Sequence, residues 1–148
     1  MGLRAQVFSL DPVVAGLEGT RTTHPWLWGV VMETGYSNGI ATLVALADGT
    51  TNLYLSAGGG SSVAAGTRPA VAAATHALLS TAEASIGNFA LDDTDHVPKV
   101  GYVRLRLLGW ADRRGAEAEE DQISQPGHPL APVFHAAHAV VTQLRLIS

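Results

Sequence analysis

Residues 26–62 read WLWGVVMETGYSNGIATLVALADGTTNLYLSAGGGSS, and this stretch decides the fold. Its apolar segments 26–33, 40–47 and 50–56 are separated by an Asn-Gly pair and an Asp-Gly pair. Both pairs favour a tight turn between antiparallel strands, because glycine adopts a positive φ without steric cost. The stretch therefore predicts a three-stranded meander that ends in a glycine tract.

The alanine-rich segment after the glycine tract has the spacing of an amphipathic helix. Thr67 suits the N-cap, Pro69 suits the first turn, and Gly87-Asn88 is typical of a helix end. The positions that recur three or four residues apart form one stripe: Val71, Thr75, Leu78, Leu79, Ala82 and Ile86. A stripe of this kind is buried against a neighbouring layer, so the helix is predicted to cover one face of the meander.

The second half of the chain adds one strand and one helix to this pattern. Residues 100–110 alternate between apolar and polar side chains, and a second apolar stripe begins near Pro129. The predicted fold is α+β, a two-layer sandwich in which an antiparallel meander sheet, of order β-β-β-α-β-α, carries two helices packed on one face. Residues 1–148 are expected to form a single α+β domain, with an N-terminal arm at 1–25 and a mobile charged loop at 111–128, part of which could pair as a strand extension.

The composition is typical of a globular protein: 47% of the 148 residues are hydrophobic, 15% are charged and none is cysteine. The lack of cysteine excludes disulfides, thiolate zinc sites and cysteine nucleophiles. No apolar run approaches the roughly 18 residues that a membrane span needs, and a net charge of −4 with scattered basic residues argues against nucleic acid. Abundant alanine and arginine are typical of a GC-rich bacterial genome, and we expect a cytoplasmic protein.

The glycine tract is a candidate anion-binding or nucleotide-binding site, with Gly58, Gly59, Gly60, Ser61 and Ser62 as its residues. It lies between a predicted strand and a predicted helix, where backbone N–H groups and the helix dipole hold anions. It lacks the Lys-Ser/Thr ending of a P-loop and the G-x-G-x-x-G spacing of a dinucleotide fold. The alternative is an ordinary crossing loop whose glycines admit close packing.

A second candidate is a metal site formed by His96, His135 and His138 together with the aspartates between Asp92 and Asp95. Histidines three residues apart on a helix share one face and can bind one metal ion. Imidazoles and carboxylates from separate segments are also how hydrolytic metal sites are assembled. The alternative places the two helical histidines on a solvent-facing or subunit-facing surface, opposite the apolar stripe.

Two tryptophans and one acid stand out in the first predicted strand. Strict alternation puts Trp26 and Trp28 on one face, where they would form either a dimer interface or part of the core. Glu33 is the one acid in this apolar segment. A buried carboxylate there would be a functional candidate, but its place at the predicted strand end favours the surface.

The run from WGVVMETGYSNG through LYLSAGGG resembles a family of small, uncharacterised bacterial proteins with this meander and glycine tract. The resemblance covers about residues 28–82, and it implies neither an activity nor a catalytic residue. The order of meander and helix is also similar to roadblock/longin and profilin-like sandwiches. That similarity implies a dimerising scaffold.

No complete catalytic constellation is found in the sequence, which lacks a G-x-S-x-G elbow. The preferred interpretation is a non-catalytic, homo-oligomeric module, most simply a homodimer, that binds a partner or a small ligand and needs no cofactor. One alternative is a small metal-dependent hydrolase that uses the histidines and aspartates named above. The other is an anion or nucleotide sensor at the glycine tract.

Overall fold

The computed structural model describes residues 3–56, 61–64 and 68–146. In this part of the chain, seven strands form one antiparallel sheet in the order β4-β3-β2-β1-β6-β7-β5. The strands are β1 (Leu27–Tyr36), β2 (Gly39–Leu46), β3 (Thr51–Leu55), β4 (Ser61–Ala64), β5 (Ala90–Leu91), β6 (Tyr102–Gly109) and β7 (Arg113–Glu119). The long strand β1 lies in the middle of the sheet, between β2 and β6.

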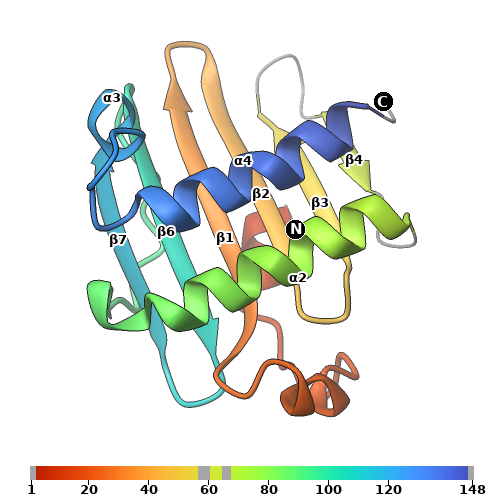
Figure 1. The fold of residues 1–148 in the computed structure, drawn as a ribbon. Helices are drawn as coiled ribbons and strands as arrows, with labels where there is room; N and C mark the ends of the chain where they lie inside the picture. Colours follow the sequence, from red (N-terminus) through yellow and green to blue (C-terminus); the bar gives the residue numbers. More distant parts are fainter. Residues whose placement is uncertain (1–2, 57–60, 65–67, 147–148) are drawn as a thin grey trace.

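Helices lie on both faces of the sheet (Figure 1). The two long helices, α2 (Pro69–Ala84) and α4 (Ala131–Arg145), run side by side across one face, and the short α1 (Leu3–Phe8) lies behind the sheet. Three shorter helical segments connect these elements: η1 (Glu18–Thr22), η3 (Ile86–Asn88) and α3 (Glu120–Ile123). Among the described residues, no helix combines the length and the apolar character that crossing a membrane requires.

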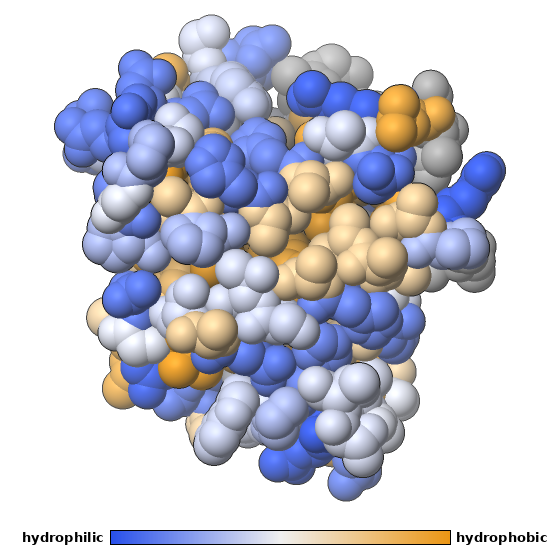
Figure 2. Space-filling view, in the orientation of Figure 1, coloured by the Kyte–Doolittle hydropathy of each residue, from blue (hydrophilic) through white to orange (hydrophobic). Residues whose placement is uncertain are grey.

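The main core lies between the sheet and the two long helices. The predicted stripe is buried there at Val71, Thr75, Leu78, Leu79 and Ala82, so the amphipathic helix predicted after the glycine tract is confirmed. Ile86, the last residue of the predicted stripe, lies beyond α2 in η3 and is only partly buried. The proposed cap Thr67 lies outside the described residues. On the outside of this layer, hydrophobic residues gather along the line between the two helices, and hydrophilic residues surround them (Figure 2).

A β-bulge in β1 changes which residues share a face. Between Leu27 and Gly29, β1 advances two residues while its partner β6 advances one, so Trp28 is the extra residue. Leu27 and Val30 therefore both face the long helices, whereas Trp28 packs into a second core on the opposite face. Strict alternation from residue 26 is wrong at this point. The buried residues of the second core are Val7, Leu17, Trp28, Val31, Val44 and Leu108.

The α+β sandwich with both long helices on one face is confirmed, but the described sheet also contains β4, β5 and β7. Strand β7 and helix α3 fall within 111–128, so the segment is not the continuous loop predicted there, and part of it pairs as a strand. The strand reads RRGAEAE, in which Ala116 and Ala118 pack against the main core. Alanines between charged residues give a weak apolar alternation, and the sequence pattern therefore favoured a loop.

The N-terminal arm predicted at 1–25 is packed rather than loosely attached. Val7 of α1 is buried in the second core. At the end of the segment His24 is buried, with its Nδ1 3.2 Å from Oε1 of Glu83 and its Nε2 3.0 Å from Nδ1 of His76. The segment thus contacts the back of the sheet and also helix α2.

Candidate functional site

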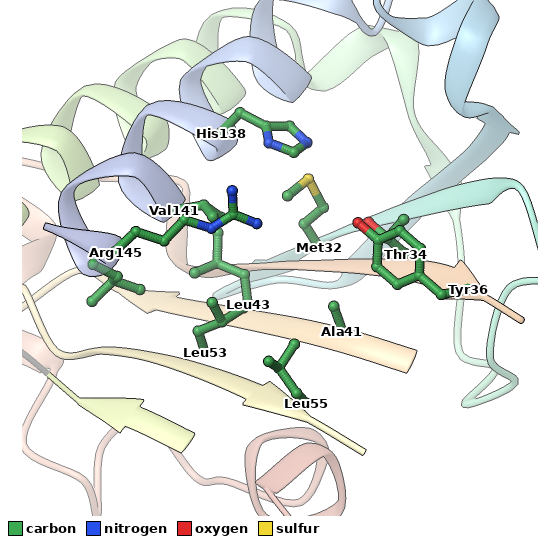
Figure 3. A pocket seen from close by; sticks show the side chains of 11 residues that line it. Met32, Thr34, Tyr36, Ala41, Leu43, Leu53, Leu55, His138, Val141 and Arg145 are labelled. Carbon is green, nitrogen blue, oxygen red and sulfur yellow. The ribbon is translucent and has the colours of Figure 1, made fainter. Parts of the chain in front are cut away.

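A cavity lies between the sheet and the C-terminal part of α4 (Figure 3). Its volume is about 250 Å³. The lining residues are Met32, Thr34 and Tyr36 from β1, Ala41 and Leu43 from β2, Leu53 and Leu55 from β3, and His138, Val141, Leu144 and Arg145 from α4. The cavity is therefore built on three neighbouring strands and one long helix.

The periods of these elements explain why the lining residues meet. Positions 32, 34 and 36 alternate along β1 and share the face that carries α4. On α4, residues three, four and seven positions apart lie on one side of the helix, which brings His138 and Arg145 over the same part of the sheet. Ala41 occupies its position on β2 with a single methyl group, so the space beside it stays open.

Four polar side chains reach this otherwise apolar cavity: Thr34, Tyr36, His138 and Arg145. Burial lowers the pKa of His138, and its Nε2 is buried without a hydrogen-bond partner among the described residues. Burial raises the pKa of Tyr36, and the negative charge of Glu120 raises it further. At neutral pH the cavity therefore presents a neutral imidazole and a protonated phenol beside a guanidinium.

The opposite face of the sheet carries a set of paired charges, which we call the ionic cluster: Arg4, Glu33, Asp92, Arg104 and Arg106. Glu33 and Arg106 are 0% exposed. Glu33 accepts hydrogen bonds from Nη1 of Arg106 at 3.0 Å, from Nε of Arg4 at 2.8 Å and from the hydroxyl of Thr42 at 2.8 Å. Its carboxylate is therefore fully engaged inside the protein.

Asp92 forms the other anionic part of the ionic cluster. It accepts a hydrogen bond from Nη2 of Arg104 at 2.6 Å and lies 3.4 Å from Nε of Arg106. The ring of Phe8 lies over the guanidinium of Arg106, 5.1 Å from its central carbon. Arg106 also donates to the carbonyl oxygen of His96. The cluster thus holds α1 and the connection before β6 against the sheet. Its two carboxylates, of Glu33 and Asp92, are engaged in these ion pairs and hydrogen bonds.

Asp92 makes the stability of the protein depend on pH. Burial alone raises its pKa, but hydrogen bonds from Thr94 and Arg104 outweigh this and hold the pKa at about 2, against 3.8 for the free side chain. A depressed folded-state pKa gives stability that is present above the unfolded pKa and is lost as the pH falls through the folded one. We therefore expect the stabilisation from Asp92 to decline from roughly pH 4 and to disappear near pH 2.

The comparison of wild type with Asp92→Asn isolates this contribution. Free energies of unfolding from urea titrations, measured between neutral pH and about pH 2, should differ most at neutral pH and converge as the acid protonates. A difference that stays constant across this range would show that the ionised form of Asp92 is not what stabilises the fold.

The predicted metal ligands do not meet. His96 lies on the face of the ionic cluster, with its Nε2 3.8 Å from Oε1 of Glu117, whereas the other two histidines are on α4. His135 is exposed, with its Nε2 3.1 Å from the carbonyl oxygen of Ser124. His138 does not lie opposite the apolar stripe as predicted, because it packs against Phe134 and lines the cavity. Among the described residues, no three His, Cys, Asp or Glu side chains form a group able to hold a metal ion.

The glycine tract also differs from its prediction where it can be followed. Gly58, Gly59 and Gly60 lie outside the described residues, but Ser61 and Ser62 belong to β4, which pairs with β3. Helix α2 begins only at Pro69. The two serines are therefore part of a strand rather than of a loop that leads directly into a helix N-terminus.

The residues singled out in the first strand have separate environments. Trp26 precedes β1 and is 65% exposed, whereas Trp28 is 7% exposed and donates from its ring to the carbonyl oxygen of Gly109. The bulge separates the face of Trp28 from that of Val30 and Met32, and the predicted interface role of the two tryptophans stays a prediction. Glu33 is buried rather than at the surface, because β1 continues three residues beyond it to Tyr36.

Sequence reasoning missed most residues of the cavity. Thr34 and Tyr36 follow the predicted end of the first strand, and Arg145 was not among the candidate residues. A signal was present in the alternation of Met32, Thr34 and Tyr36, which continues the strand period past Glu33. Their meeting with α4 depends on how the helix lies across the sheet, which periodicity alone does not give.

Comparisons of this chain with protein-family models, with curated proteins and with solved structures find no match. The resemblance of residues 28–82 to a bacterial family, and the similarity to roadblock/longin or profilin-like sandwiches, therefore stay predictions. The function of the protein has to follow from the geometry of its own residues.

Proposed function

We propose that this protein is a non-catalytic binding module whose ligand is a small, mostly apolar molecule held in the cavity between the sheet and α4. The observation that carries the proposal is the composition of the cavity wall. An apolar surface from β1, β2, β3 and α4 surrounds a few polar groups from Tyr36, His138 and Arg145. Small-molecule sites in proteins have this character: a concave apolar wall with a few convergent polar groups.

The size of the cavity limits the size of the ligand. An engineered cavity of about 150 Å³ holds benzene, which has six carbon atoms. A cavity of about 250 Å³ is then suited to a molecule of roughly ten non-hydrogen atoms. A straight eight-carbon chain with a small polar head has this size, and it is a suitable probe.

The polar groups of the cavity favour binding over catalysis. Nucleophilic catalysis needs a nucleophile within hydrogen-bond reach of a base. The buried Nε2 of His138 has no such partner among the described side chains. Burial also lowers the pKa of this imidazole, so it is neutral at neutral pH and can serve as a hydrogen-bonding group for a ligand. A homodimer and a cytoplasmic location remain part of the proposal, and the exposed Trp26 is available to an interface.

Ala41→Phe is expected to abolish binding of a cavity ligand, because its ring would occupy the open space beside β2. We expect 1-octanol to bind saturably to the wild-type chain in isothermal titration calorimetry, and its affinity to fall at least tenfold in this variant. Ala73→Phe is the matched control, since it adds the same ring at an exposed position of α2. Equal binding by wild type and Ala41→Phe would place the ligand elsewhere.

A further inference from the structure

We infer that the cavity ligand is an anion: an apolar molecule of about ten non-hydrogen atoms whose single carboxylate is bound by Arg145. The inference rests on the proposed function, and it names the chemical class of the ligand. Its basis is the arrangement of charged groups around the cavity. The guanidinium of Arg145 is the cationic group of the lining, and no carboxylate is among the lining residues that the structure describes.

The positions of the side chains give the ligand a direction. Figure 3 shows the guanidinium of Arg145 and the imidazole of His138 reaching from α4 over the strands that carry Leu43, Leu53 and Leu55. A carboxylate at the guanidinium would place its hydrocarbon chain against these leucines. A guanidinium has five N–H donors and binds carboxylates through two parallel hydrogen bonds. Arg145 can therefore hold a ligand in addition to its contacts within the protein.

A second charge acts on the polar groups of the cavity, with the opposite sign to Arg145. Glu120, at the start of α3, raises the pKa of Tyr36 and of His138, and Arg145 lowers both. The negative charge of Glu120 therefore acts on the polar groups of the cavity and repels an anion there. The positive charge of Arg145, which itself lines the cavity, attracts an anion to its guanidinium. One carboxylate beside Arg145 and an uncharged chain directed away from it satisfy both fields.

Three probes of equal chain length separate charge recognition from apolar binding: octanoate, 1-octanol and octylamine. At neutral pH they carry a negative charge, no charge and a positive charge. We expect octanoate to bind the full chain roughly tenfold more tightly than 1-octanol, and octylamine to bind most weakly, as a partly exposed charge-assisted contact allows. Isothermal titration calorimetry at low ionic strength measures all three affinities.

Arg145→Gln should remove the preference for octanoate while leaving the affinity for 1-octanol unchanged. Arg21→Gln is the matched control, because it removes an exposed arginine that lies over the ring of Trp110, away from the cavity lining. Glu120→Gln removes the negative charge that repels an anion from the cavity, and it should strengthen octanoate binding severalfold. This gain cannot come from a damaged fold, so it supports the inference independently of the loss in Arg145→Gln.

The possible outcomes separate this inference from the proposed function. If 1-octanol or octylamine binds as tightly as octanoate, the cavity binds ligands but does not select an anion, and the inference is wrong. A preference for octanoate that survives in Arg145→Gln overturns it as well. If none of the three probes binds the wild-type chain saturably, the proposed function itself is wrong.

Discussion

Glu33→Ala is expected to lower the free energy of unfolding by about 3–5 kcal/mol, the range found when one partner of a buried ion pair is removed. The reason lies in Arg106, which is 0% exposed and is held by Glu33 at 3.0 Å. Without the carboxylate, a guanidinium stays in the interior with less compensation for its lost hydration. Desolvation already lowers the pKa of Arg106, and the charges of Glu33 and Asp92 oppose that effect.

The rest of the ionic cluster is less vulnerable to the loss of Glu33. The side chain of Arg4 is 29% exposed, so water can replace part of what the carboxylate provides. Asp92 would keep its hydrogen bonds to Arg104 at 2.6 and 3.1 Å. Most of the expected loss therefore comes from the single buried guanidinium, and it should appear as a lower urea midpoint with an unchanged slope.

A double variant distinguishes a buried unpaired charge from a simple loss of packing. In Glu33→Leu with Arg106→Met, both charges are replaced by apolar side chains, and such replacements are often neutral or stabilising. We expect the double variant to be more stable than Glu33→Ala by at least about 2 kcal/mol. If it is less stable than the single variant, the cluster contributes through hydrogen bonding that the apolar pair cannot replace, and the argument from an unpaired charge is wrong.

The helical layer could be predicted from the sequence because its signal is local. The stripe from Val71 to Ala82 repeats every three or four residues, and those positions are buried. The Asp48-Gly49 pair likewise predicts its turn, since Gly49 has a φ of 93°. Each of these inferences needs only neighbours in the sequence, and each is confirmed.

The second face of the sheet could not be predicted because its stabilising contacts are remote in sequence. Glu33 and Arg106 are 73 positions apart, and each looks like an ordinary surface charge in its own segment. The pairing of charges on this face also explains why a polar segment such as β7 can form a strand, since charged side chains are acceptable where they are paired. The bulge at Trp28 is equally hidden, because it is defined by the partner strand β6.

The candidate site was only partly accessible to sequence reasoning. His138 was selected as a metal ligand, but it lies in an apolar cavity with Tyr36 and Arg145 instead. The sequence gives the spacing of residues along α4, and this spacing correctly places His138 and Arg145 on one side. The angle at which α4 crosses the sheet decides what they face, and this angle depends on packing along the whole layer.

Gly115→Ala is expected to destabilise the protein by about 2–3 kcal/mol, as much as the loss of a buried charged hydrogen bond. The structure leaves no room for a methyl group at this position of β7. An added Cβ would lie 3.0 Å from Cγ of Asp92 and closer still to its Oδ2. The carboxylate would have to move, although Arg104 and Thr94 hold it in place. The pairing of Asp92 with the two arginines of β6 is the interaction that the movement disrupts.

A double-mutant cycle with Asp92→Ala tests this cause directly. Asp92→Ala should cost a similar free energy on its own, because it removes the same pairing. In the double variant no carboxylate remains for the new methyl group to displace. The loss of stability in the double variant should therefore be about 1–2 kcal/mol smaller than the sum of the two single losses. Urea denaturation of the four proteins at neutral pH gives the coupling. Strictly additive losses would mean that the methyl group strains β7 by itself. Gly115 would then be required by the strand rather than by the space that the Asp92 carboxylate occupies.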